Sequence, residues 1–234
     1  QQGRVLSNDS LDLSAERVLN HQGFINSRGT LGAQLGYLDN SGGEFSSHAA
    51  TYRNVAALDN VAGLIMAGQN LSLAVSGAVN NRNGRLGANH AVNLSGTTLD
   101  NSQNGLITAA HDFNLSLTHL DNHGGLVNAG AARLHAGTVE NSGGRIATKA
   151  DLVATFGSLT QQGGELIAQG NLSLTGTTLH NRKGGLVGAG KALTVQVDTV
   201  DNRGGELSSS AALNLVGQQL NNSNGGKVLA GMDL

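Results

Sequence analysis

The feature that most constrains the fold of this 234-residue chain is a repeat of about twenty residues that runs from end to end. Eleven copies of one tripeptide, spaced 19, 20 or 21 residues apart, mark the repeat. A short fixed period of this kind indicates a solenoid or another repeat architecture. Nine copies end in asparagine, one in glutamine and one in histidine: Leu38-Asp39-Asn40, Leu58-Asp59-Asn60, Val79-Asn80-Asn81, Leu99-Asp100-Asn101, Leu120-Asp121-Asn122, Val139-Glu140-Asn141, Leu179-His180-Asn181, Val200-Asp201-Asn202, Leu220-Asn221-Asn222, Leu159-Thr160-Gln161 and Leu19-Asn20-His21.

Each repeat contains three short runs in which apolar and polar residues alternate, separated by turns. A pair such as Leu172/Leu174 opens the unit, the tripeptide follows, and a glycine turn such as Gly184-Gly185 precedes a third run that begins with an aliphatic residue such as Val187. Alternation with period two is typical of strands, and no segment has a helical period. We therefore predict an all-β, three-stranded parallel β-helix of roughly eleven coils, which at about 4.8 Å per coil is about 50 Å long.

The composition agrees with coils that are hydrogen-bonded on both sides. The chain has no Pro, which would remove a ladder donor, and 35 Gly, which supply turn conformations. The last residue of each tripeptide points the same way as its leucine, so its amide can stack on the amide one coil away. The predicted amide column is Asn40, Asn60, Asn81, Asn101, Asn122, Asn141, Gln161, Asn181, Asn202 and Asn222.

Composition also excludes several classes of protein. The absence of Cys excludes disulfides and thiolate sites, and a net charge of −2 gives no basic footprint for nucleic acid. No apolar run approaches the roughly 18 residues of a membrane span, and no cofactor motif occurs. Leucine-rich repeats have a different consensus, and neither a six-residue nor a calcium-binding nine-residue repeat is present.

The unit from Asn171 to Gly190 resembles the haemagglutinin repeats of filamentous haemagglutinin-type exoproteins of bacterial two-partner secretion. The resemblance covers essentially the whole chain and weakens between Gly29 and Ala57, where irregular coils are expected. It implies a right-handed helix, secretion through an outer-membrane two-partner transporter, a secreted or cell-surface location, and a role in adhesion, virulence or contact-dependent growth inhibition. The chain starts in mid-repeat at Gln1, so we expect residues 1–234 to be one β-helix segment of a longer protein.

Two sets of polar side chains are candidate metal sites. Asp39, Asp59, Asp100, Asp121 and Glu140 form an outward carboxylate row that could recruit Ca²⁺, although Ca²⁺ needs six or more converging oxygens and a hydrated row is favoured. The histidines lack the spacing of metal ligands and are interpreted as exposed turn residues. These histidines are His90, His111, His119, His123 and His135.

The chain is not predicted to be an enzyme, and a polysaccharide-degrading β-helix enzyme is the least favoured alternative, because such enzymes build their sites from long loops that these repeats lack. Two functions remain: a rigid stalk or adhesin segment that displays adhesive or toxin regions to a host or neighbouring cell, and a carbohydrate- or receptor-binding module. A receptor or glycan patch is expected where aromatic and arginine side chains break the repeat. These residues are Tyr37, Phe45, His48, Tyr52 and Arg53.

Overall fold

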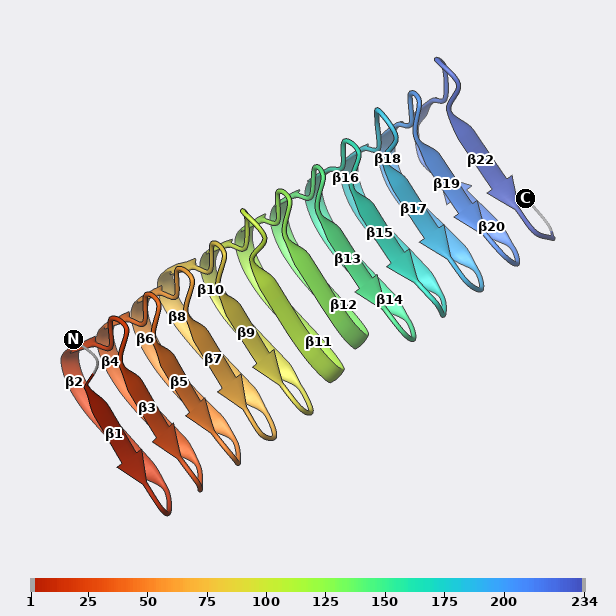
Figure 1. Cartoon of the computed structure of the whole chain (residues 1–234). Coiled ribbons are helices and arrows are strands. Elements are labelled where there is room, and N and C mark those ends of the chain that lie inside the picture. The colour runs from red at the N-terminus through yellow and green to blue at the C-terminus, as the bar shows by residue number, and fades with distance from the viewer. Residues whose placement is uncertain (1–2, 233–234) are drawn as a thin grey trace.

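The computed structural model describes residues 3–232, and within this range the chain forms twenty-two strands and no helix (Figure 1). Most coils contain one four-residue strand and one nine-residue strand. The four-residue strands are β1 (Arg4–Ser7), β3 (Phe24–Ser27), β5 (Glu44–Ser47), β7 (Leu64–Ala67), β9 (Arg85–Ala88), β13 (Arg145–Thr148), β15 (Glu165–Ala168), β17 (Leu186–Ala189), β19 (Glu206–Ser209) and β22 (Lys227–Ala230).

The longer strands follow the short ones along the chain. In two central coils the short and long strands merge, because the connection between them stays extended; in the last coil the long strand is split. The longer strands are β2 (Leu11–Leu19), β4 (Leu31–Asp39), β6 (Thr51–Asp59), β8 (Leu71–Asn80), β10 (Val92–Asp100), β11 (Leu106–Asp121), β12 (Leu126–Glu140), β14 (Leu152–Thr160), β16 (Leu172–His180), β18 (Leu193–Asp201), and the pair β20 (Leu213–Val216) and β21 (Gln219–Asn221).

All strand pairs are parallel, and each strand pairs with its counterpart one coil away. Arg145 aligns with Glu165, and Leu152 aligns with Leu172. Figure 1 shows the coils stacked side by side with the chain ends at opposite ends of the stack. The predicted all-β parallel solenoid of about eleven coils is confirmed, and the rise per coil gives a length of about 50 Å.

The structure differs from the three-strand prediction at one corner of the coil. In β4 the side chains of Leu31, Leu35 and Leu38 are buried, while Gly36 and Tyr37 both face outward. The alternation therefore shifts by one residue at a bend, and pairing resumes at once, with Tyr37 opposite Ala57. No turn residue separates two of the three predicted runs, so they form one bent strand.

The lumen is filled by stacked aliphatic side chains from both kinds of strand. Ile65, Leu71, Leu99 and Val187 are fully buried, and equivalent positions in neighbouring coils form continuous columns. Residues 29–55, in the region where irregular coils were expected, keep the register of both neighbouring coils, and the register against β8 shifts between Val55 and Leu58. The lumen side chains also depart from the repeat, because Thr51 aligns with Leu31 and Leu71.

Candidate functional site

A ladder of side-chain amides runs the length of the solenoid at the corner after each long strand. Each Nδ2 donates to the Oδ1 of the next coil, at 2.7 Å from Asn101 to Asn122 and from Asn122 to Asn141. Within residues 3–232 there are ten such amide-to-amide bonds, and their lengths lie between 2.6 and 3.3 Å. The longest is the bond from Gln161 Nε2 to Asn181 Oδ1, because glutamine is one methylene longer than the other members.

The ladder is buried and anchored to the backbone. Asn141 is fully buried, and its Nδ2 also donates to the carbonyl of Glu165 at 3.0 Å. The predicted column is present, with one correction at its first coil. Val18 aligns with Leu38, so Asn20 occupies the column, with its Nδ2 2.7 Å from Asn40 Oδ1, and His21 lies in the following turn.

Where a turn has two glycines, as at Gly143-Gly144, each is favoured for a different physical reason. Gly143 has a φ of 60°, a left-handed conformation that Asn83 and Ala62 adopt in other coils. Gly144 has no positive φ, but a Cβ there would lie 2.0 Å from the carbonyl oxygen of Asn122 in the coil before. The second glycine is therefore required because the backbone of the preceding coil packs directly against it.

The outward carboxylate row closes the same turns. Asp39 and Asp100 accept the N–H two residues later, from Ser41 at 2.9 Å and from Ser102 at 3.0 Å, which is an Asx-turn geometry. Asp59 instead accepts from side chains of the neighbouring coils, the Tyr37 hydroxyl and Asn80 Nδ2. No group of three or more His, Cys, Asp or Glu side chains in residues 3–232 is arranged to hold a metal ion.

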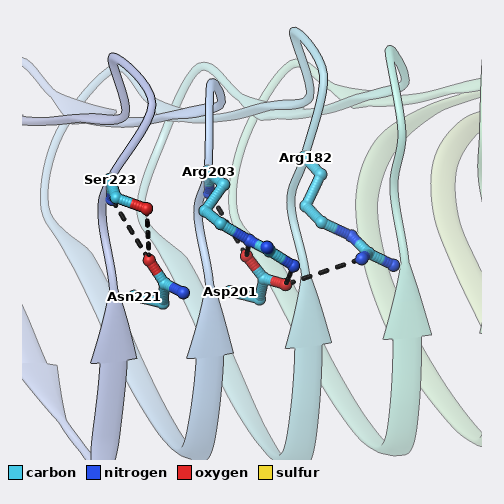
Figure 2. Close-up of polar contacts among 5 residues, drawn as sticks. All are labelled: Arg182, Asp201, Arg203, Asn221 and Ser223. Carbon is cyan, nitrogen blue, oxygen red and sulfur yellow. Dashed lines mark hydrogen bonds and ion pairs between the residues drawn. The ribbon is translucent and has the colours of Figure 1, made fainter.

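At the C-terminal end of the row two arginines surround one aspartate (Figure 2). Arg203 donates from Nε and Nη2 to Asp201, both at 2.8 Å, and Arg182 Nη1 lies 3.6 Å from Asp201 Oδ2. The hydrogen bond from Arg203 lowers the pKa of Asp201 below its usual value. One coil later Asn221 replaces the aspartate and accepts the backbone N–H and hydroxyl of Ser223. This cluster joins neighbouring turns through polar contacts on the outer surface.

The candidate histidines are distributed over several corners. The rings of His90 and His111 meet edge to face with centroids 5.4 Å apart, and His119 Nδ1 lies 2.5 Å from Thr138 Oγ1. His123 is an exposed turn residue, and His135 lies on the outer face of β12. The structure therefore does not bring the five side chains together.

The five residues of the predicted receptor patch are divided between the lumen and different outer faces. Phe45 and Arg53 are buried in the lumen, so they cannot belong to a surface patch. Tyr52 is 53% exposed on the outer face of β6, His48 is in the turn after β5, and Tyr37 lies at the bend of β4. The five residues are divided because consecutive residues of a strand, such as 52 and 53, point to opposite faces.

Two of these five residues have pKa values shifted by their surroundings. A hydrogen bond from the Tyr37 hydroxyl to Asp59 Oδ2, together with partial burial, raises the pKa of Tyr37 to about 12. Burial lowers the pKa of the Arg53 guanidinium well below its usual value. The Arg53 Cζ lies 3.3 Å from the centroid of the Phe45 ring.

A shallow groove of about 910 Å³ runs along the outer face of the long strands over several coils. One column of aligned outward residues runs along the groove from Tyr52 to Arg133. These two residues are four coils, or about 19 Å, apart. Between them lie Ser72, Asn93 and Asn114, and Asn114 Nδ2 donates to Asn93 Oδ1 at 2.8 Å. Sequence reasoning identified only Tyr52 among these five. The other four could have been found from their outward position in the alternation.

No helix in the described part of the chain is long and apolar enough to cross a membrane. The chain matches the haemagglutinin repeat family over residues 6–75, 72–152, 129–182 and 177–231. No curated protein and no solved structure matched the chain. The four family matches together cover most of the chain, and each spans several of the stacked coils. The chain therefore belongs to the haemagglutinin repeat family of filamentous haemagglutinin-type proteins.

Proposed function

We propose that this chain is a rigid extracellular spacer of a two-partner-secreted exoprotein, which holds adhesive or toxin regions away from the producing cell so that they can contact a host or neighbouring cell. The observation that carries the proposal is the uninterrupted stack of coils, joined by parallel ladders and by the buried amide column. In a solenoid of this kind each coil contacts only its neighbours, so length grows linearly with coil number.

Family membership supports the extracellular part of the proposal, because haemagglutinin repeats belong to secreted structural and adhesive proteins. The composition agrees with passage through an outer-membrane two-partner transporter, since a chain with no Cys forms no disulfides that would hinder threading. The connections between strands in residues 3–232 are short turns, which supports a function in length and display.

Rigidity can be measured directly, because the chain has no native Cys and can be labelled at chosen sites. Gln34 and Gln196 occupy the same exposed outward column, eight coils apart. Spin labels on the variant Gln34→Cys/Gln196→Cys should therefore give a narrow distance distribution centred at about 38 Å, apart from the label arms. A broad or bimodal distribution would contradict a rigid spacer.

The groove on the long strands favours a second function, binding of an extended oligosaccharide. Tyr52 offers an exposed aromatic ring on which a sugar ring can stack, and Ser72, Asn93 and Asn114 offer hydroxyl and amide groups along the axis. A peptide could not add to this sheet as an extra strand, because the long strands of the groove are already paired on both sides. Among linear polymers an oligosaccharide therefore suits this surface best.

A glycan array tests this second function. Tyr52→Ala should reduce binding to the retained glycans at least about tenfold, while Thr194→Ala, in the same column beyond the groove, should leave binding unchanged. If no glycan binds the wild type, or if Tyr52→Ala binds equally well, the oligosaccharide function is wrong. The spacer function would be unaffected by either result.

A further inference from the structure

The third coil, which contains β5 and β6, places polar side chains where its neighbours have aliphatic ones. Thr51 occupies the column of Leu31 and Leu71. Arg53 occupies the column of Ala33 and Leu73. Arg53 is the single charged residue among the buried side chains of residues 3–232, so this coil differs in kind from those above and below it.

The guanidinium of Arg53 has no hydrogen-bond partner. Arg53 is 2% exposed, and within residues 3–232 none of Nε, Nη1 and Nη2 has an acceptor. The hydroxyl groups of Ser47 and Thr51 do not bond to it: Ser47 Oγ lies 2.7 Å from Thr51 Oγ1 and also donates to the carbonyl of Ala49. The remaining favourable interaction of the guanidinium is its contact with the face of the Phe45 ring, over which it lies.

A cation on an aromatic face is stabilised less than a buried, unpaired cation is destabilised. Opening the coil hydrates the guanidinium, which reduces the free-energy cost of opening there relative to coils with Leu in the same column. In residues 3–232 two coils precede this one, and they contact the later coils through it. In a stack of nearest neighbours, opening of the third coil therefore breaks the contact between these two coils and the later ones.

We infer that the third coil, residues 44–60, is a weak point at which the solenoid opens first, while the later coils stay folded. The burial of Arg53 lowers the free energy needed to open this coil, and the contact between Arg53 and the ring of Phe45 partly offsets this effect.

Amide hydrogen exchange followed by mass spectrometry tests the inference. In the wild type, β5 and β6 should exchange at least about tenfold faster than β15 and β16. Arg53→Leu should slow exchange in β5 and β6 at least about tenfold, because leucine already fills this column at Leu73 and Leu94. Arg133→Leu removes an exposed arginine and is the matched control, with no expected change in β5 or β6.

A double-mutant cycle separates the arginine from ordinary fraying of the chain end. Phe45→Leu should speed exchange in β5 and β6 when Arg53 is present and should have a smaller effect in the Arg53→Leu background. Arg53→Leu should also convert a biphasic urea transition into a single one. Equal exchange in β5 and β15, or an Arg53→Leu variant that exchanges as fast as or faster than the wild type, would overturn the inference.

Discussion

At the scale of single residues, the coil is specified by contacts that neighbouring coils make at the corner. Gly144 is needed because the carbonyl of Asn122 occupies the space of a side chain, whereas Gly143 is needed only for its backbone conformation. The Gly-Gly repeat is visible in the sequence, but sequence alone identifies both glycines only as turn residues. The close approach that fixes the second one depends on the coil below it.

The two glycines of one turn should therefore respond differently to substitution. Gly144→Ala should destabilise the fold by about 1–3 kcal/mol or more, because the new Cβ overlaps a backbone oxygen that cannot move freely. Gly143→Asn should change the free energy of unfolding by less than about 0.5 kcal/mol. No contacting atom lies within 4 Å of the position that the new Cβ would take, and Asn tolerates this left-handed conformation. Urea unfolding of both variants checks the contrast, and equal losses would contradict it.

The amide ladder makes a second prediction at this scale. Asn101→Ala removes its bonds to Asn81 and Asn122 and leaves the Oδ1 of Asn122 without its ladder donor. The free energy of unfolding should fall by about 1–3 kcal/mol. Asn128→Ala, at an exposed position, is the control and should be close to neutral. A neutral Asn101→Ala would mean that the column does not contribute to stability.

Tyr37 gives a prediction that depends on pH. In Tyr52→Phe, Tyr37 is the only phenol, and its absorbance should titrate with a midpoint of about 12. Because the folded pKa exceeds the ordinary value of 10.0, the bond to Asp59 stabilises the fold below pH 10, and this contribution is lost as the pH rises from 10 to about 12. Adding Asp59→Asn should lower the midpoint. An unchanged midpoint would show that Asp59 does not cause the shift.

At the scale of the strand, the alternation of side chains decides whether a residue faces the lumen or the outer surface. Alternation predicted the lumen columns and the amide column, including the fully buried Leu99 and Asn101. It did not reveal the bend, because two consecutive outward residues look like a turn in the sequence. The predicted receptor patch combined residues that face opposite sides of the strands. The alignment of Arg53 with Leu73 would have placed Arg53 in the lumen.

A charge on the lumen side of a strand should be far more costly than one on the outer side. Leu99→Asp should destabilise by about 3–5 kcal/mol, because the carboxylate would be buried without a partner. Amide exchange should increase first in β10 and in its partners β8 and β11. Ser95→Asp, exposed on the same strand, should stay near the wild type. Similar unfolding curves for the two variants would contradict the assignment of lumen and outer faces.

At the scale of the whole molecule, the solenoid behaves as a stack in which a coil is the unit of length. The twenty-residue period was sufficient to predict the fold class and the number of coils. Sequence could not predict where the stack is weak, because that depends on whether a buried side chain such as Arg53 finds a partner in three dimensions.

Removal of one complete coil should therefore be tolerated. Deletion of residues 145–164 joins Gly144 to Glu165, which aligns with Arg145 and so preserves the register. The label distance between positions 34 and 196 should shorten by about 4.8 Å. The melting temperature should change by only a few degrees, roughly 2–4 °C for each kcal/mol lost. Deletion of residues 145–154 removes half a coil and should prevent cooperative folding. Equal melting of both deletions would contradict the stack.

The direction of the amide ladder gives the rod a permanent dipole along its axis. Backbone bonds between coils run both ways, as from Asn20 N–H to Asp39 and from Phe24 N–H to Gly3, and largely cancel. The ladder bonds all point from lower to higher residue number, from Asn20 to Asn222, so their dipoles add and the positive pole of the column points toward Asn222. This polarity is the reverse of that of an α-helix, whose positive end is its N-terminus.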